Sequence, residues 1–140
     1  MRVLGIDYGE KTIGAAVSCE NARIAFELET VRRENGAALK KSLGRLKELT
    51  RLYNVGEIVL GLPLRLNGEM GERAQKTLAF KEKLEKYIKR VKIILWDERF
   101  STREAYGNLI ETGADTQNVD AAAARIILQS YLDYKNADSK

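Results

Sequence analysis

Hydrophobic residues come in short runs along the chain, and the spacing within each run predicts a strand or a helix. Residues 2–7 (RVLGID) and 12–18 (TIGAAVS) are compact apolar runs separated by Tyr-Gly-Glu-Lys, which predicts a hairpin with Gly9 in its turn. Apolar and polar residues alternate over residues 22–31, and this period of two predicts a third strand. We therefore expect three consecutive antiparallel strands.

The period changes after the third run. Residues 36–53 place four leucines and a tyrosine at helical spacing, with Asn35 as a plausible N-cap. Residues 57–63 (EIVLGLP) are continuously apolar after the first glutamate, as in a strand that is buried on both faces of a sheet. Residues 64–71 (LRLNGEMG) are expected to form a loop.

The second half alternates between helix and strand. A long helix is expected over residues 72–89, a buried strand over 91–96 (VKIILW), a helix beginning near Ser101, and a final helix over 120–134. Residues 137–140 are expected to be a frayed tail. The apolar face of the long helix is expected to consist of Ala74, Leu78, Leu84 and Ile88.

The element order β-β-β-α-β-α-β-α-α predicts one α/β domain over residues 1–136, with a mixed sheet and helices on both faces. If the strand at 57–62 lies beside the first strand, the two run parallel and end at the same edge of the sheet. Ligands of such sheets bind outside the carboxyl ends of the strands.

Composition narrows the chemistry. The chain contains no histidine and one cysteine, Cys19, which excludes Ser-His-Asp and Cys-His catalysis and thiolate zinc cages. Lysine and arginine outnumber aspartate and glutamate by 24 to 20, a mildly basic balance that suits a polyanionic partner without requiring one. Hydrolytic chemistry would have to depend on carboxylates. With no signal peptide, no 20-residue apolar span and no possible internal disulfide, we expect a cytoplasmic protein that does not contact membranes.

Acidic residues stand at three places that this topology could bring to one edge. Asp7 ends the first strand, Asp97 and Glu98 follow the last strand, and Asp120 begins the final helix. Clustered carboxylates repel one another unless a cation lies between them, and all-oxygen ligands point to Mg²⁺ or Mn²⁺. Such a site suits phosphodiester hydrolysis.

Each acid also has a purely structural interpretation. Asp7 could hydrogen-bond its own turn, Asp97 could pair with Arg99, Glu98 could be a solvated surface acid, and Asp120 could be an N-cap. The opening Gly-Ile-Asp-Tyr-Gly hairpin is also similar to the phosphate loop of actin-like ATPases and sugar kinases. That fold needs two related domains, and 140 residues leave room for one.

Four segments together resemble the YqgF family of the ribonuclease H-like superfamily, whose members are described as Holliday junction resolvases or pre-16S rRNA nucleases. They are LGIDYGEKTIGAAVS at 4–18, IVLGLPLRLNGEMGERA at 58–74, WDERFSTREA at 96–105 and VDAAAARIILQSYL at 119–132. Their order and spacing cover nearly the whole chain.

The resemblance implies a five-stranded mixed sheet flanked by helices and a nuclease that acts on structured nucleic acid with Mg²⁺ or Mn²⁺. It assigns Asp7, Glu98 and Asp120 as metal ligands and catalytic acids, with Asp97 as the reserve for Glu98. The implied role is maturation of the 5′ end of pre-16S rRNA, with the ribosomal particle as a further partner. Basic and hydroxyl groups beside the motifs are expected to hold the nucleic-acid backbone: Lys11, Arg65, Arg73, Arg99, Thr102 and Arg103.

Two alternatives remain open from the sequence. One is Holliday junction resolution, for which a two-fold dimer is expected because both strands of a symmetric junction must be cut. For a nuclease that cuts one RNA strand, the expected oligomeric state is a monomer or weak homodimer. The other alternative is a nucleic-acid-binding module without catalytic activity, against which the intact acids argue.

Overall fold

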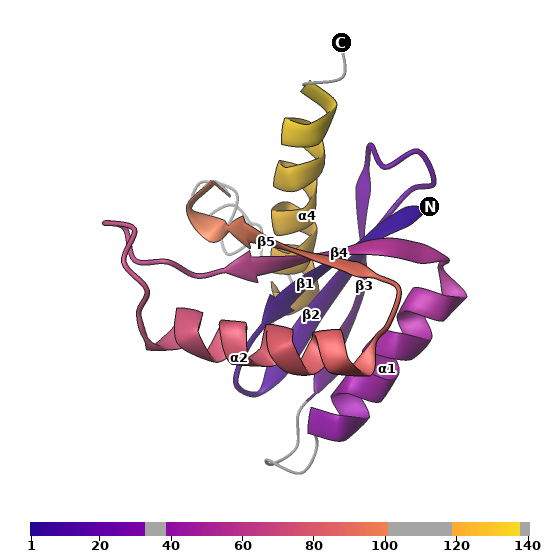
Figure 1. The fold of residues 1–140 in the computed structure, drawn as a ribbon. Helices are drawn as coiled ribbons and strands as arrows, with labels where there is room; N and C mark the ends of the chain where they lie inside the picture. Colours follow the sequence, from indigo (N-terminus) through magenta and orange to yellow (C-terminus); the bar gives the residue numbers. More distant parts are fainter. Residues whose placement is uncertain (33–38, 101–118, 138–140) are drawn as a thin grey trace.

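A five-stranded mixed sheet in the order β3-β2-β1-β4-β5 forms the centre of the molecule (Figure 1). The computed structural model describes residues 1–32, 39–100 and 119–137. The strands are β1 (Arg2–Tyr8), β2 (Thr12–Ser18), β3 (Ala25–Arg32), β4 (Val55–Leu62) and β5 (Lys92–Asp97). β1, β2 and β3 are successively antiparallel, whereas β4 pairs parallel with both β1 and β5. The carboxyl ends of β1, β4 and β5 therefore meet at one edge, as the sequence predicted.

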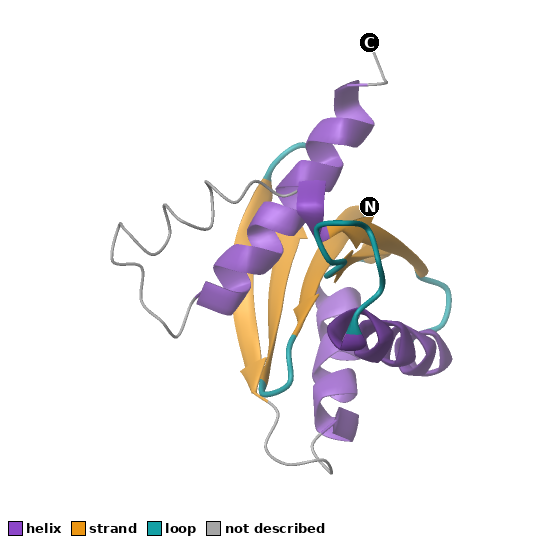
Figure 2. Cartoon of the chain, turned by 90° about the vertical axis from the view of Figure 1, so that its left-hand side faces the viewer, coloured by secondary structure: helices purple, strands orange, loops and turns teal. Residues whose placement is uncertain are grey.

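Helices cover both faces of this sheet. The helices are α1 (Leu39–Leu52), α2 (Glu72–Tyr87) and α4 (Val119–Ala137), and a short 3-10 helix, η2 (Glu98–Phe100), follows β5 directly. Figure 2 shows α4 on one side of the strands and the other two helices on the opposite side. Across the described ranges, no helix has the length and apolar character needed to cross a membrane.

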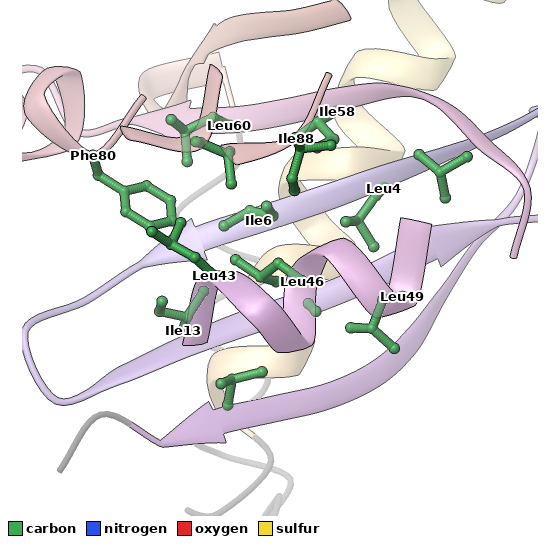
Figure 3. Close-up of a cluster of buried hydrophobic side chains, with 14 residues drawn as sticks. Leu4, Ile6, Ile13, Leu43, Leu46, Leu49, Ile58, Leu60, Phe80 and Ile88 are labelled. Carbon is green, nitrogen blue, oxygen red and sulfur yellow. The ribbon is translucent and has the colours of Figure 1, made fainter. Parts of the chain in front are cut away.

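Large aliphatic side chains fill the space between the sheet and the α1–α2 layer (Figure 3). Leu43, Leu46 and Leu49 of α1 pack on Ile6 and other residues of the strands, in agreement with the leucine spacing. These positions recur every three or four residues, so they form a single stripe along the helix.

The predicted apolar face of α2 needs one correction. Ala74, Leu84 and Ile88 are buried as expected, but Leu78 is only half-buried. Thr77 and Phe80 are buried in its place, and the Phe80 ring stacks on Tyr8 with ring centroids 4.2 Å apart. The buried stripe is thus rotated slightly around the helix, because the aromatic contact with the first strand sets the orientation of α2.

On the opposite face, glycines of the strands lie beneath α4, and the helix comes close to the strand backbone. A Cβ atom placed on Gly5 would be 2.7 Å from Leu128 Cβ, and one on Gly61 would be 2.7 Å from Ile127 Cδ1. A Cβ atom on Gly14 would overlap the Asp120 carbonyl oxygen. Glycine in these strands therefore permits the close approach of a helix.

Element boundaries agree with the predictions within a few residues. The final helix runs from Val119 through Ala137, so the predicted tail at 137–140 begins at least one residue too early. The remaining tail residues, the predicted N-cap Asn35 and the helix expected from Ser101 lie outside the described residues.

Candidate active site

Asp7 and Glu98 meet at the carboxyl edge of the sheet, although 90 residues separate them in sequence. Alternation along β1 places Asp7 on the α4 face, together with Gly5. β5 ends at Asp97, and the turn of η2 brings Glu98 back over β4, where a Cβ atom on Gly61 would lie 2.6 Å from Glu98 Oε1. The two carboxyl groups form a side-chain hydrogen bond.

Both acids have raised pKa values, and burial is the largest cause in each case. Burial raises the pKa of Asp7, and the nearby charge of Asp120 adds to that effect, while Glu98 and Arg73 oppose it. Burial and the charge of Asp7 raise the pKa of Glu98 to about 8. Near neutral pH and without a cation, the pair therefore shares a proton, which Glu98 donates to Asp7.

Asp120 approaches the same region from the start of α4. Its Oδ2 accepts a hydrogen bond of 2.5 Å from Thr12 Oγ1, at the beginning of β2. The helix begins at Val119, so Asp120 lies in the first turn and not at the N-cap. A carboxylate is favourable there because the N-terminus of a helix carries partial positive charge.

Asp97, the reserve for Glu98, has a different environment. Alternation along β5 places its side chain on the α1–α2 face, with Ile93 and Leu95. Its carboxylate accepts hydrogen bonds from Arg99 Nη2 at 2.6 Å and from the Arg99 backbone N–H at 2.9 Å. These contacts lower the pKa of Asp97. Asp97 is thus an ionised partner of Arg99, and Glu98 is the acid that contacts Asp7.

Arg73 is the residue expected to hold nucleic acid whose charge acts on the acid pair, within the described part of the chain. Arg73 stands exposed in the first turn of α2, and its charge acts on both Asp7 and Glu98. Lys11 is exposed on the β1–β2 hairpin. Thr102 and Arg103 lie outside the described residues.

The loop between β4 and α2 is held by its own hydrogen bonds and by Arg99. Gly68 N–H donates to the Arg65 carbonyl at 2.8 Å, and Gly68 adopts a φ of 87° that favours glycine. Arg99 Nη1 donates to the Leu66 carbonyl at 3.3 Å while the rest of its guanidinium holds Asp97. Arg99 therefore connects this loop to the end of β5, and Arg65 lies against Gly71 on the other side of the loop.

The donor set fits a hard divalent cation. Asp7 and Glu98 are two carboxylates forced into one partly buried place, where a cation would replace the shared proton and relieve their repulsion. Within the ranges that the structure describes, no three acidic, cysteine or histidine side chains are already arranged around a common metal position. Asp120 is directed to Thr12, so its carboxylate would have to turn to join the pair.

Sequence reasoning missed the residues that set this geometry. Thr12 orients Asp120, Gly14 admits the start of α4, and Gly61 leaves the space that Glu98 occupies. The two glycines interrupt apolar strands, which is a known signal of close backbone approach. No comparable signal marks Thr12, because its partner lies 108 residues away.

Comparison with known proteins shows the family of the chain and agrees with its fold. A family model described as RuvX, Holliday junction resolvase, matches residues 1–134. The chain belongs to this family. RuvX proteins are nucleases, so the chain is a hydrolase of phosphodiester bonds and its substrate is nucleic acid.

Curated relatives match over essentially their whole length. A protein of Agathobacter rectalis named "Putative pre-16S rRNA nuclease" is 43% identical over 138 residues, covering 96% of each chain. A protein of Bacillus licheniformis with the same name is 40% identical over 141 residues, covering 98% of this chain and all of the relative.

Solved structures of Thermus thermophilus RuvC share the fold. RuvC in complex with a Holliday junction superposes with a TM-score of 0.66 at 17% identity, covering 98% of this chain and 96% of RuvC. A second RuvC structure gives a TM-score of 0.61 at 15% identity, covering 96% and 97%. The expected ribonuclease H-like arrangement is thereby confirmed.

Proposed function

We propose that this RuvX protein hydrolyses phosphodiester bonds at the Asp7–Glu98 pair with the help of a divalent cation, Mg²⁺ or Mn²⁺. The observation that supports this most strongly is the hydrogen-bonded carboxyl pair at the carboxyl edge of the sheet. Two adjacent acids with raised pKa values are typical of a catalytic or metal site. In a site with only a structural role, their repulsion would destabilise the fold.

Each acid has a distinct role in the proposal. Asp7 and Asp120 supply oxygen ligands, and Thr12 holds Asp120 until it turns toward the pair. Glu98 would hold the cation in its ionised form or orient the attacking water. A bound divalent cation would lower the pKa of that water and stabilise the leaving oxygen. Arg73 holds the phosphate beside the acids.

The proposed substrate is the 5′ region of the pre-16S rRNA, and the names of the relatives support pre-16S rRNA as the RNA that is cut. Hydrolysis of one RNA strand requires a single active site, so a monomer or weak homodimer suffices. The proposed binding residues on the substrate side are Lys11, Arg65, Arg73, Arg99, Thr102 and Arg103, and the proposed compartment is the cytoplasm. All of residues 1–136 are proposed to act as one domain.

A second candidate substrate is a four-way DNA junction, because the matching family model carries the description Holliday junction resolvase. Symmetric cleavage of a junction needs two active sites related by a two-fold axis. The two candidates therefore differ both in substrate and in the oligomeric state required during cleavage.

Cleavage of two end-labelled substrates tests the proposal: a pre-16S rRNA fragment and a four-way DNA junction, each with Mg²⁺, Mn²⁺ or a chelator. The wild type should cut the RNA in a metal-dependent way. Asp7→Asn keeps the shape of the side chain but removes the charge, and it should reduce the rate by about a thousandfold, since metal stabilisation of the transition state amounts to several kcal/mol.

Asp133→Asn is the matched control, because Asp133 is an exposed acid of α4 whose carboxylate accepts a hydrogen bond from Gln129. This variant should cut at the wild-type rate. Equal cleavage by Asp7→Asn would refute the proposed site. Metal-dependent cutting of the junction alone would assign the second candidate substrate.

A further inference from the structure

A groove lies at the opposite end of the molecule from the acid pair, between α1 and the end of α2. Its volume is about 480 Å³. α1 ends just before β4 begins and α2 ends just before β5 begins, so the groove lies at the amino edge of the parallel strands. The groove is therefore separate from the acid pair and from the basic residues beside it.

Three exposed cations line this groove: Lys47, Arg51 and Lys89. None of them forms an ion pair with an acid in the part of the chain that the structure describes, in contrast to Lys76, Lys81 and several arginines. Their charges are thus available to a ligand. The Lys47 ammonium lies 5.3 Å from the centre of the Tyr87 ring, which orients it toward the end of α2.

The single acid in the lining, Glu48, shares Arg45 with Glu29, and the three cations of the groove outnumber it. Arg45 Nη1 contacts Glu48 Oε1 at 2.9 Å. The groove therefore keeps its positive charge. The whole of α1 shows the same bias, with Glu48 as its only acid against the cations Lys40, Lys41, Arg45, Lys47 and Arg51.

Helix electrostatics explain only part of this arrangement. A cation in the last turn stabilises a helix by interacting with its partial negative end, which accounts for Arg51 and for Lys89 beyond the end of α2. Lys47 lies in the middle of α1 and gains nothing from this effect. Its convergence with the other two on one groove needs a different explanation.

We propose that this groove binds the phosphate backbone of the RNA substrate beyond the site of cleavage. The proposal rests on the proposed function for the identity of the polyanion. Arg73 and Tyr87 stand near the two ends of α2 and are separated by about 21 Å along the helix, which corresponds to about six base pairs of a duplex, and Lys89 follows just beyond the helix. A structured RNA can therefore contact the acid pair and reach the groove.

The lining favours a nucleic-acid backbone over an acidic protein. Tight protein contacts depend on apolar or aromatic anchors in a pocket, and the apolar residue that lines this groove, Ile88, is 3% exposed and already packed in the core. Lysine and arginine at the mouth of a groove are instead the usual partners of phosphates.

Binding of RNA to Lys47→Gln/Arg51→Gln/Lys89→Gln tests the groove, in an Asp7→Asn background that keeps the RNA intact. Affinity for a duplex of about 16 base pairs should fall about tenfold or more near physiological salt, and the slope of log K against log salt should decrease by about two to three.

Two control variants make the result specific. Lys81→Gln/Arg125→Gln/Lys135→Gln removes the same charge from ion-paired positions and should leave the affinity and slope unchanged. Lys47→Arg/Arg51→Lys/Lys89→Arg keeps the charge and should restore binding. Equal melting temperatures of all variants will show that folding is intact.

RNA affinity and a salt slope equal to those of the wild type in the groove variant would overturn the proposal. If the variant then lost only its binding to polyglutamate, an acidic protein would be the partner of the groove. Cleavage of RNA is measured in a separate assay. If the wild type does not cut RNA but the groove variant still loses salt-dependent binding, the nuclease mechanism fails and the groove assignment stands.

Discussion

The two faces of the sheet are built from opposite kinds of residue. On the α1–α2 face, large side chains such as Leu46, Ile58 and Phe80 separate the helices from the strands. On the α4 face, glycines and alanines bring the helix almost into contact with the strand backbone. Both faces are buried, but only the second allows the backbone at the start of a helix to approach the end of β1.

This difference separates stability from function. Burial of large aliphatic groups contributes most of the hydrophobic stabilisation, and it tolerates small shifts of a helix. Close backbone packing contributes less area but fixes the position of Asp120 relative to Asp7. Substitutions on the first face should therefore change folding, and substitutions on the second should change activity.

Leu46→Ala is expected to have the largest effect on stability. Leu46 is fully buried in α1, and its truncation should cost about 2–5 kcal/mol of unfolding free energy. The rate of RNA cleavage per folded molecule should stay unchanged, because the residue contacts no part of the acid site. Denaturant unfolding measures the stability, and cleavage assays at low temperature measure the activity. A large loss of activity would contradict the separation of stability from function between the two faces.

Gly14→Ala should have a smaller effect on stability and a large effect on activity. The new methyl group would overlap the Asp120 carbonyl oxygen, so the start of α4 must move away from β2. We expect a loss of about 1–3 kcal/mol, typical of overpacking, together with a rate reduced by about a hundredfold or more through displacement of Asp120.

Gly44→Ala is the matched control on the other face. A Cβ atom on Gly44 would lie 3.6 Å from the Tyr87 hydroxyl, an ordinary contact, and alanine is favoured over glycine inside a helix by up to about 1 kcal/mol. This variant should be slightly more stable and fully active. If both glycine variants behaved alike, close packing of α4 would not be what positions the site.

The acid pair should make the metal-free protein less stable as the pH rises. In the folded state the pKa of Glu98 is about 8, against an ordinary value of 4.5 when unfolded. Between these values the unfolded state binds fewer protons, so the free energy of unfolding falls with rising pH. Glu98→Gln cannot ionise and should flatten this part of the profile. Its free energy of unfolding should exceed that of the wild type most at about pH 8 and above. Denaturant unfolding in a chelator measures it, and identical profiles would contradict the shared proton.

Much of this fold could be predicted because its strands are short, apolar and well separated by turn residues. The sequence left the pairing of β1 with β4 as a condition; the structure meets it, and Asp7 and Glu98 lie at one edge. Their roles as metal ligands were implied by family resemblance and stay predictions.

Side-chain orientation was harder to predict, because small rotations decide it. Thr77 and Leu78 lie next to each other at the border of the α2 stripe, and only the contact of Phe80 with Tyr8 selects between them. Asp97 and Glu98 are likewise adjacent, and the sequence could not choose between them. The end of β5 and the turn of η2 direct one to each face of the sheet.

The smallest expected effect concerns Arg99, which lies where the two faces meet. Its guanidinium is bound to Asp97 and to the Leu66 carbonyl, so it should position the loop and Glu98 more than it contacts phosphate. Arg99→Gln and Asp97→Asn should each lower stability only slightly and reduce cleavage modestly, because water screens an exposed ion pair. The double variant should be no worse than either single variant, because both remove the same contact. If Arg99 instead bound phosphate directly, Arg99→Gln alone would lower the salt slope of RNA binding by about one, and the two substitutions would act independently.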